Sequence, residues 1–467
     1  MMITFLLNDR LIQTALSPST TVLDFVRYEA DLRGTKIGCR EGDCGACTVL
    51  VGTLKEDNVE YMSVTSCLTP IANVYGKHVV TVEGLNLDHL NKVQQAIVNH
   101  SGTQCGFCTP GFVVSLCGYA ITSGKNPTYS EAISSIDGNI CRCTGYKSIE
   151  RAALEITSEL CQKDPAHPME WLVSKGFLSE YFLTVRERLS SIPKIADISG
   201  KIPVGGGTDL YVQKFDDVQN IDLKYLFDRS GLRSVHVEND LCTISSSSTV
   251  TDMMTSESLQ RAIPNWLDSM KLVSSTPIRN IATVAGNLAN ASPIGDLTII
   301  LLAMNAQITL ANENGMIRKV FLKDFYKGYK KMDMQDDEII IEITFDLPEK
   351  NTWFNFEKVC KRQYLDIATV NTAIGMTMNH DIIISAHCSA GGVSPVPLYL
   401  RKTSSVLSGR KLSVELIRHA AEVLATDIAP ISDVRGSAEY KRLLLRQLFY
   451  SHFINMFPFM FELKELI

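Results

Sequence analysis

The chain has 467 residues, of which 45% are hydrophobic and 21% charged, so it is long enough for about three domains with well-filled cores. Its formal net charge is −6, and we find no basic run long enough to follow a phosphate backbone, which argues against nucleic-acid binding. The N-terminal MMITFLLNDR lacks the features of a signal peptide, and no apolar stretch approaches the roughly 18 residues of a membrane span. We therefore expect a cytoplasmic protein without membrane contact, in which thiols stay reduced.

The first fifty residues combine regular elements with one glycine-rich stretch. The sequence predicts a β-hairpin over MITFLLNDRLIQTAL (2–16), a helix over TTVLDFVRYEA (20–30) and a strand over ACTVLVGT (46–53). Between the helix and the strand, GCREGDCGACTVL (38–50) holds three cysteines and too many glycines for a regular element. We therefore expect a loop whose thiols share one task.

The cysteines of this loop have the spacing of an iron–sulfur site. Cys39, Cys44 and Cys47, followed by Cys67, give the pattern C-x4-C-x2-C…C of plant-type ferredoxins. Four thiolates must converge on two irons, and glycine permits the backbone angles of a loop that wraps a cluster. The sequence predicts a 2Fe–2S cluster on these four cysteines.

A second set of four cysteines follows in QCGFCTPGFVVSLCGYAI (104–121) and NICRCTGY (139–146). Cys105 and Cys108 stand where a helix is expected to begin, with a proline near its first turn, and Cys141 and Cys143 precede the helical pattern SIERAALEI. Two helix starts directed at one point favour an anionic thiolate cluster. We expect this set to hold a second metal centre.

Other readings of the cysteines remain open from the residues alone. A disulfide framework would need an oxidising compartment, and zinc is an alternative for the second set in particular, since C-x2-C with C-x-C also suits zinc. The five other cysteines lie in apolar or mixed surroundings and are expected to be small buried hydrophobic residues: Cys117, Cys161, Cys242, Cys360 and Cys388.

A glycine-rich turn follows a polar stretch, CQKDPAHPMEW (161–171), that is typical of a linker. In KIPVGGGTDLYVQ (201–213) a strand runs into three glycines, which form either a tight turn or a nest of N–H groups around a phosphate. The run fits neither the Rossmann fingerprint, because Leu210 holds the third glycine position, nor a Walker motif.

A second stretch, PIRNIATVAGNLANASPIGDL (277–297), is rich in small residues and has no strong helix or strand periodicity. Gly286 and Gly295 permit close backbone approach. The neutral polar side chains of this stretch suit hydrogen bonds to a pyrophosphate, and these are Thr283, Asn287, Asn290 and Ser292. Asp296 suits a hydrogen bond to a ribose hydroxyl. A buried, turn-rich connection is the alternative.

The order of the two cysteine patterns, with GCREGDCGACTV, QCGFCTPG and CRCTGY, resembles the iron–sulfur part of the xanthine dehydrogenase family of molybdenum hydroxylases. The resemblance implies a β-grasp ferredoxin domain and a four-helix domain, each with one 2Fe–2S cluster. It also places Gln104 and Cys143 against the pterin of a molybdenum cofactor on a partner.

The two glycine-rich stretches resemble the FAD-binding loops of the same family's vanillyl-alcohol-oxidase-type flavin domain. The resemblance implies that 203–210 wrap the FAD pyrophosphate and that further residues line the flavin or the dinucleotide. The first group is Pro203, Val204, Gly205, Gly206, Gly207, Thr208, Asp209 and Leu210, and the second is Val273, Thr283, Gly286, Asn287, Ser292, Asp296, Ile340 and Lys358.

The whole chain is thus expected to be an α+β multidomain protein. The domains are a ferredoxin domain (1–77), a helical 2Fe–2S domain (78–158), a linker (159–172), an FAD-binding domain (173–350) and a C-terminal α+β flavoprotein domain (351–467). One departure from the family lies in KRQYLDIATV, where Leu365 stands at a position that is often acidic and Asp366 is kept. Charge beside a flavin affects its potential and its acceptor.

The function that the resemblance implies is electron transfer in a two-chain xanthine dehydrogenase. Substrate is oxidised on a large molybdenum-binding partner, so no catalytic residue is expected here, and electrons reach NAD+ through both clusters and FAD in a dimer of two-chain units. The alternatives are the same role in an aldehyde, nicotinate or aromatic-CoA hydroxylase, and a zinc- and nucleotide-binding scaffold without a redox role.

Overall fold

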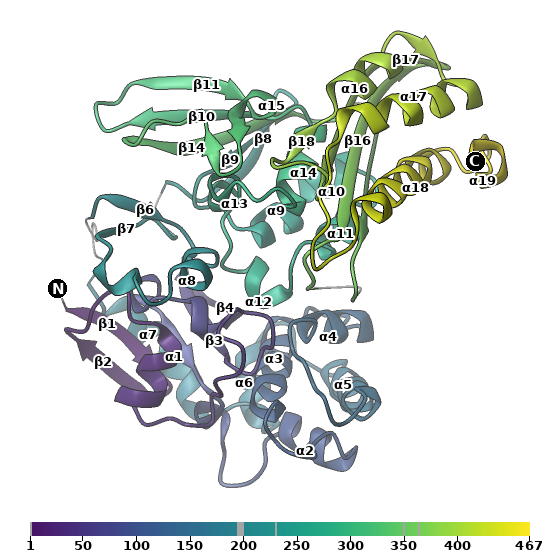
Figure 1. Ribbon diagram of the computed structural model, residues 1–467. Coiled ribbons are helices and arrows are strands. Elements are labelled where there is room, and N and C mark those ends of the chain that lie inside the picture. The colour runs from purple at the N-terminus through teal and green to yellow at the C-terminus, as the bar shows by residue number, and fades with distance from the viewer. Residues whose placement is uncertain (1, 194–199, 229–230, 349–350, 363–364) are drawn as a thin grey trace. The chain divides into compact units, whose positions relative to one another are not determined.

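The computed structural model describes residues 2–193, 200–228, 231–348, 351–362 and 365–467 (Figure 1). It divides into two compact units. The first comprises Met1–Phe227 with Ser275–Ala282, and the second comprises Asp228–Ser274 with Thr283–Ile467. Both units mix helices with sheets, which confirms the expected α+β multidomain class.

The first unit begins with a five-stranded sheet in the order β2-β1-β5-β3-β4. Its strands are β1 (Ile3–Leu7), β2 (Arg10–Thr14), β3 (Thr48–Lys55), β4 (Asn58–Thr65) and β5 (His78–Val80). β1 pairs with β5 in parallel and the other pairs are antiparallel. A helical segment, α1 (Val22–Asp24) continued by a π-helical turn (Phe25–Glu29), supplies Val22, Leu23 and Phe25 to the same buried core as the sheet. This is the expected β-grasp arrangement.

Four helices follow: α2 (Lys92–Asn99), α3 (Thr109–Thr122), α4 (Tyr129–Ser135) and α5 (Lys147–Leu160). α3 is buried over Gly111–Ala120, in keeping with its continuous apolar sequence. α5 buries one stripe that includes Ile149, Ala152, Ala153 and Ile156. Capping boxes begin α2 at Asn91 and α4 at Thr128.

The stretch expected as a linker, 159–172, contributes buried residues to this helical core, and its role as a domain boundary stays a prediction. Residues 168–174 form a helix whose Leu172 is 1% exposed, and Lys163 is buried, with its ammonium donating to the carbonyls of Ala120, Ile121 and Ser123 at the end of α3. The lysine thus satisfies the terminal carbonyls of that helix, which the polar composition of the stretch does not reveal.

The rest of the first unit surrounds a two-stranded parallel sheet, β6 with β7. The later elements of this unit are α6 (Pro168–Ser174), α7 (Val185–Ser190), β6 (Ile202–Val204), α8 (Leu210–Gln213), β7 (Leu223–Tyr225) and α12 (Thr276–Arg279). Short 3-10 turns lie at Ser66–Leu68, Ile71–Val74, Val82–Leu85, Glu180–Thr184 and Val218–Asn220.

The second unit contains an antiparallel sheet in the order β11-β10-β14-β9-β8. Its strands are β8 (Val235–Glu238), β9 (Leu241–Ser245), β10 (Gln307–Asn312), β11 (Ile317–Phe321) and β14 (Glu338–Asp346). The helices and short strands around it are α9 (Val250–Thr255), α10 (Glu257–Ala262), α11 (Trp266–Lys271), α13 (Val284–Asn290), α14 (Asp296–Ala303), α15 (Leu322–Phe325), β12 (Tyr326–Gly328) and β13 (Lys331–Met332).

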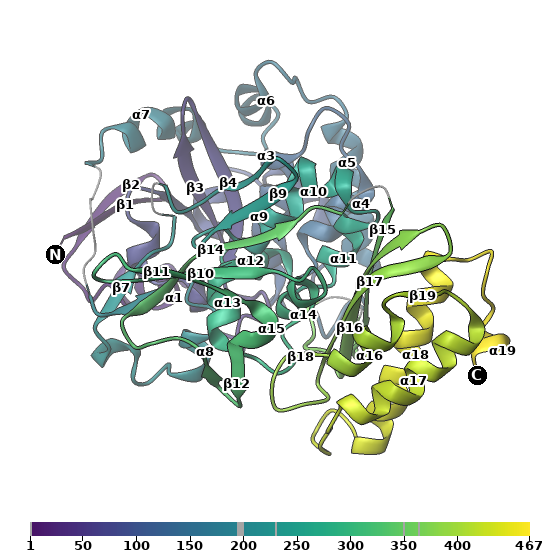
Figure 2. The ribbon, with the colours of Figure 1, turned by 90° about the horizontal axis from the view of Figure 1, so that it is seen from above.

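A last sheet, β15-β16-β17-β18 with β19 beside β17, lies between α14 and the C-terminal helices (Figure 2). Ile374 and Met376 enter the core shared with the helices, whereas Gly375 between them faces α14, where a Cβ would meet the carbonyl of Ala303 at 2.6 Å. The elements are β15 (Thr352–Val359), β16 (Val370–Asn379), β17 (Ile382–Gly391), β18 (Leu398–Tyr399), α16 (Arg401–Leu407), β19 (Arg410–Lys411), α17 (Val414–Asp427), α18 (Ala438–Met456) and α19 (Leu463–Leu466).

The stretch 277–297, for which the sequence shows no regular period, overlaps three short helices, α12, α13 and the start of α14. Thr283 begins α13 by accepting a hydrogen bond from the amide of Gly286 at 3.2 Å. Local capping thus produces helices that are too short to show a hydrophobic period.

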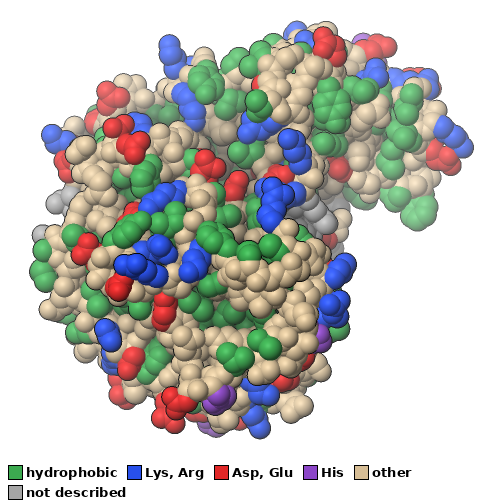
Figure 3. All heavy atoms as spheres, turned by 60° about the horizontal axis from the view of Figure 1, so that its bottom comes forward, with side chains coloured by type: hydrophobic (Ala, Val, Ile, Leu, Met, Phe, Trp, Pro, Cys, Tyr) green, Lys and Arg blue, Asp and Glu red, His purple; other side chains and the backbone are tan. Residues whose placement is uncertain are grey.

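The surface charge and the helices can be compared with what a nucleic-acid-binding protein or a membrane protein would require. On the face drawn in Figure 3, lysine and arginine side chains are interspersed with aspartate and glutamate. Among the described residues, no helix combines the length and the apolar character that crossing a bilayer requires.

Candidate functional site

The first four cysteines meet in two pairs at the tip of the β-grasp sheet. The Sγ atoms of Cys47 and Cys67 are 3.4 Å apart, and the thiols of Cys39 and Cys44 are joined by a hydrogen bond. Two sulfurs that bind one tetrahedral metal at about 2.3 Å lie about 3.8 Å apart. The pair of Cys47 and Cys67 therefore has close to the spacing of two thiolates on one iron of a 2Fe–2S cluster.

Glycine makes the close approach of this loop possible. A Cβ on Gly38 would lie 2.6 Å from the sulfur of Cys44, and Gly42 and Gly45 have φ angles of +78° and +66°. Arg40 fastens the loop to the helical segment by two hydrogen bonds to the carboxylate of Asp24, at 2.6 and 3.2 Å. The contact between Arg40 and Asp24 thus fixes the position of the loop relative to the helical segment.

The surroundings favour a thiolate within this set. The hydrogen bond from Cys44, helped by backbone N–H groups such as that of Glu41, lowers the pKa of Cys39 to about 5 in spite of burial. The hydrogen bond from Cys67 likewise lowers the pKa of Cys47. The same hydrogen bonds, together with burial, raise the pKa of Cys44 and of Cys67, so each pair favours one thiolate and one thiol. Metal ligation requires the deprotonated form, and a bound cluster would displace the remaining protons.

The second set of cysteines is also arranged two by two. The Sγ atoms of Cys105 and Cys143 are 3.6 Å apart, and the thiols of Cys108 and Cys141 are joined by a hydrogen bond. Burial acts to raise the pKa of Cys141, but hydrogen bonds from the hydroxyl and amide of Thr144, at 3.2 and 3.4 Å, outweigh it and lower that pKa. In the described part of the chain, no three His, Cys, Asp or Glu side chains surround one ion position, so the thiols meet as pairs.

The two sets differ in their exposure to solvent. Cys47 and Cys67 are 2% and 1% exposed, whereas Cys105 and Cys143 are both exposed. Gln104, beside Cys105, is also exposed. The second set therefore presents one pair of sulfurs at the surface of the first unit.

Of the five other cysteines, which were expected to be buried, only some are. Cys117, Cys242 and Cys388 are buried, Cys360 is half-buried and Cys161 is exposed. Cys161 directly follows Leu160, the last buried residue of α5, and the next position along a helix turns away from the buried stripe. All thirteen cysteines lie within the described ranges and are free thiols, so these ranges contain no disulfide framework.

In the first unit, the glycine-rich turn links β6 to α8. A Cβ on Gly206 would lie 1.7 Å from the carbonyl oxygen of Ile281, and Gly207 has a φ of +87°. Asn73 supports the turn by donating to the carbonyl of Gly205 at 3.2 Å. Pro203 is exposed, and the turn continues through Val204, Thr208 and Asp209 to Leu210, the first residue of α8.

In the second unit, an ion pair lies at the start of α14. The ammonium of Lys358 donates to the carboxylate of Asp296 at 2.7 Å and to the carbonyl of Leu272 at 2.7 Å. The amide of Asn371 donates to the other carboxylate oxygen at 2.5 Å. The Lys358 side chain is fully buried and that of Asp296 is 11% exposed. Sequence reasoning singled out the acid and the lysine but missed Asn371, because no local signal links a strand asparagine to a helix 75 residues away.

The remaining predicted flavin residues of the second unit lie on several elements. Thr283 and Gly286 belong to the start of α13, and Asn287 accepts a hydrogen bond from the hydroxyl of Thr298. Ile340 is buried in β14 beside an irregularity in its pairing with β10. Val273 is buried directly after Leu272, and Ser292 is half-buried before α14. The contact of each with FAD stays a prediction.

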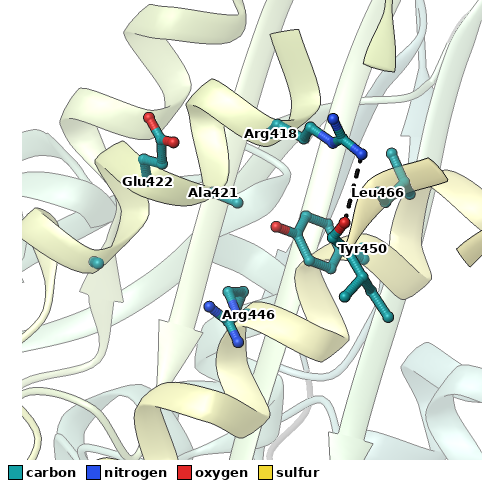
Figure 4. A pocket seen from close by; sticks show the side chains of 8 residues that line it. Arg418, Ala421, Glu422, Arg446, Tyr450 and Leu466 are labelled. Carbon is teal, nitrogen blue, oxygen red and sulfur yellow. Dashed lines mark hydrogen bonds between the residues drawn. The ribbon is translucent and has the colours of Figure 1, made fainter. Parts of the chain in front are cut away.

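A hollow of about 570 Å³ lies away from these residues, between α17, α18 and the C-terminal turn (Figure 4). Arg418 reaches across it to donate to the carbonyl of Ile467 at 3.4 Å. None of the residues that line it was predicted as a site residue. They are Arg418, Ala421, Glu422, Ala425, Arg446, Tyr450, Leu466 and Ile467.

Four protein-family models match the chain in succession. A 2Fe-2S iron-sulfur cluster binding domain matches residues 6–72, a 2Fe-2S binding domain 81–154, an FAD binding domain in molybdopterin dehydrogenase 194–348, and a CO dehydrogenase flavoprotein C-terminal domain 356–456. In this order the matched domains resemble the small-subunit architecture of molybdenum hydroxylases. Two 2Fe–2S domains and an FAD-binding domain confirm the expected clusters and flavin, and they favour iron–sulfur over zinc for both cysteine sets.

The xanthine dehydrogenases that this chain is similar to are longer than the chain. Xanthine dehydrogenase 1 of Arabidopsis thaliana is 26% identical over 521 aligned positions, covering 93% of this chain and 38% of the plant protein. Xanthine dehydrogenase of Emericella nidulans is 29% identical, covering 88% of this chain and 35% of the fungal protein. The chain thus spans less than two fifths of the length of these relatives.

A solved structure, carbon monoxide dehydrogenase from Hydrogenophaga pseudoflava, shares the fold over part of the chain. It matches with a TM-score of 0.51 and 24% identity over 53% of this chain and 86% of the other. At this identity the similarity concerns the fold alone. It supports the α+β assignment of the part of the chain that it covers.

Proposed function

We propose that this chain is the electron-transfer subunit of a xanthine dehydrogenase, acting between a molybdenum cofactor on a large partner chain and NAD+ during oxidation of hypoxanthine and xanthine. When bound, the two 2Fe–2S clusters would carry single electrons, and FAD, which can accept electrons one at a time and release them as a pair, would connect one-electron with two-electron chemistry. The substrate and NAD+ are the finer parts of the proposal and follow from the resemblance to xanthine dehydrogenases.

One observation carries the proposal: both sets of paired thiols lie in a single compact unit. The Sγ distances of 3.4 Å between Cys47 and Cys67 and 3.6 Å between Cys105 and Cys143 suit two thiolates that share one iron. The same unit contains the glycine turn 205–207, which we propose as the binding site for the FAD pyrophosphate. Donor sets for successive redox groups in one unit are what a chain of electron carriers needs.

The chain's own residues hold and tune these groups. The eight cysteines supply the thiolates. The amide of Glu41 donates to the sulfur of Cys39 at 3.3 Å, and Thr144 donates to that of Cys141. Such donors stabilise negative charge on sulfur and thereby influence the reduction potential.

The exposed sulfur pair marks the side on which we place the large partner. Cys105, Cys143 and Gln104 are all exposed, and Phe107 beside them is 47% exposed. An aromatic ring next to exposed ligands suits burial against another protein. The proposed assembly is a dimer of two-chain units, and the free thiols favour the cytoplasm as its location.

We propose that the electron acceptor approaches the flavin near Leu365, where the sequence departs from the acidic residue that is common in the family. Leu365 has a φ of +77° and is 8% exposed, while Asp366 is paired with the guanidinium and amide of Arg362. Gln363 and Tyr364 of the same stretch lie outside the described residues. The one retained acid is thus neutralised by its neighbour, and its charge acts on an approaching acceptor less than a free carboxylate would.

Purification of the assembly from its native source tests the proposal. We expect a larger molybdenum-bearing companion, iron and FAD, and substrate-dependent reduction of NAD+ by xanthine or hypoxanthine. Oxidation of an aldehyde, nicotinate or an aromatic-CoA compound in place of purine would transfer the same role to another hydroxylase. Colourless protein that contains zinc and no iron would contradict the electron-transfer role itself.

A further inference from the structure

The two cysteine loops of the first unit touch each other directly through one short run, 138–141. The amide of Ile140 donates to the carbonyl of Cys44 at 3.0 Å, and the residue that follows Ile140 is Cys141. A single hydrogen bond therefore joins a ligand of the first set to the residue preceding a ligand of the second.

Asn139 holds this junction with every polar atom of its side chain. Its Nδ2 donates to the carbonyl of Gly45 at 3.1 Å and reaches the hydroxyl of Thr48 on β3 at 3.4 Å. Its Oδ1 accepts from the hydroxyl of Ser115 on α3 at 2.8 Å. The side chain is buried, with the residue 5% exposed. One amide thus connects the first cluster loop, the sheet behind it and the helix that follows Cys108.

The backbones at the junction are as close as glycine allows. A Cβ on Gly45 would lie 2.4 Å from the carbonyl oxygen of Gly138, and a Cβ on Gly111 would lie 2.3 Å from that of Gly45. Real Cβ atoms do not approach oxygen so closely, so any other residue at either position must push the loops apart.

We propose that Asn139 is a positioning residue that sets the spacing between the two iron–sulfur centres. The inference rests on the proposed function, because it needs both cysteine sets to carry clusters. Only a side chain that donates and accepts at once satisfies the Gly45 carbonyl and the Ser115 hydroxyl together. Alanine leaves both buried partners without Asn139, and aspartate replaces the donor by a second acceptor.

The first test compares Asn139→Ala with Asn91→Ala in the full chain within its native complex. Asn91 is a matched control, since it is fully buried in the same unit and donates to the carbonyl of Leu85 at 2.8 Å. Iron content, magnetic splitting between the two reduced clusters in electron paramagnetic resonance, and hydrogen exchange of the Ile140 amide are measured.

In Asn139→Ala we expect iron to be retained, the splitting to weaken and the Ile140 amide to exchange about 10- to 100-fold faster, because the buried bonds that hold the junction are lost. Asn91→Ala should leave both the splitting and this amide unchanged. A fully loaded Asn139→Ala protein with the splitting of the natural chain overturns the inference.

A second pair of variants decides the question if Asn139→Ala does not load iron. Gly111→Ala keeps the Asn139 side chain but inserts a methyl group 2.3 Å from the carbonyl oxygen of Gly45 and 3.0 Å from Nδ2 of Asn139. Gly118→Ala, on the same helix, meets only the flexible end of Leu50, at 2.8 Å. We expect weaker splitting in the first variant and unchanged splitting in the second; equal splitting in both overturns the inference.

Failure of the proposed function gives a different result. If the natural chain, reduced in its complex, lacks two interacting paramagnetic signals, the assignment of clusters to both cysteine sets is wrong and the inference falls with it. Two interacting signals that are indifferent to Asn139 and Gly111 remove the positioning role alone.

Discussion

The guanidinium of Arg279 donates to the carboxylate of Asp137 at 2.6 Å, and the two side chains are only 1% and 5% exposed. Thr276 completes the contact by donating its amide and hydroxyl to the same carboxylate. All three residues belong to the first unit, although 142 positions of chain separate Asp137 from Arg279. The pair ties the run before Cys141 to the segment 275–282.

Asp137→Asn should lower the unfolding free energy of the first unit by about 3–5 kcal/mol, because it leaves a buried guanidinium without its counter-charge. Denaturant unfolding followed by loss of the visible absorption of the clusters measures the change. Asp31→Asn is the control, since Asp31 pairs with Arg33 at an exposed position and should cost about 0.5 kcal/mol or less. Equal effects of the two substitutions would contradict a structural role for the buried pair.

Cys141→Ser should remove one of two cluster signals from the electron paramagnetic resonance spectrum and halve the iron content. The thiol of Cys141 pairs with that of Cys108, so its loss leaves one iron of the second set short of a ligand. Cys117→Ser provides the control, because Cys117 is buried in the core of the same domain and belongs to neither set. Persistence of both signals in Cys141→Ser would show that the second set is misassigned.

Asp296→Asn should reduce the ratio of bound FAD to iron several-fold. The substitution keeps the shape of the side chain but leaves the buried ammonium of Lys358 without a carboxylate, which disturbs the contact to Leu272 next to Val273. Flavin and iron are measured on the same sample. Iron should be unaffected because every cysteine ligand lies in the first unit; parallel loss of both would mean that Asp296 acts through folding.

Stability should fall as the pH drops below about 6.5, in part because of His78. Burial lowers the pKa of His78 to about 3, while its ring accepts from Tyr61 and donates to the carbonyl of Asn8. The unfolded chain takes up a proton below its ordinary pKa and the native chain does not, so the contribution is present above 6.5 and is lost toward 3.

Between pH 7 and 5 this loss should amount to about 2 kcal/mol, at about 1.4 kcal/mol for each pH unit below 6.5. His78→Gln should flatten the dependence of unfolding free energy on pH. His89→Gln, at an exposed position, should leave the slope unchanged. An unaltered slope in His78→Gln would assign the acid sensitivity to other groups.

The two cysteine sets could be recognised from the sequence because their spacing is local, and their role as metal ligands stays a prediction. The spacing from Cys39 to Cys47 and the pair Cys105 and Cys108 lie within short windows, and the hairpin and strand predicted around the first loop correspond to β1, β2 and β3. Alternation and thiol spacing are properties of neighbouring residues, so one sequence suffices to find them.

The polar partners that hold the sites were not predictable in this way. Asn139, Asn371 and Arg279 act on residues 75 to 142 positions away, and nothing near them in sequence marks those partners. The stretch 159–172 likewise has the composition of a linker, which does not show that Lys163 and Leu172 are buried. These contacts depend on tertiary packing, which a single sequence does not encode in a readable pattern.

The path of the chain has a consequence for biosynthesis. The polypeptide leaves the first unit after Phe227 and returns to it only for Ser275–Ala282. At about 5–20 residues per second, a ribosome needs on the order of ten seconds to make the 142 positions from Asp137 to Arg279. Throughout that interval the carboxylate of Asp137 lacks its partner Arg279. A metal inserted into the unfinished chain would therefore enter before this ion pair closes the first unit.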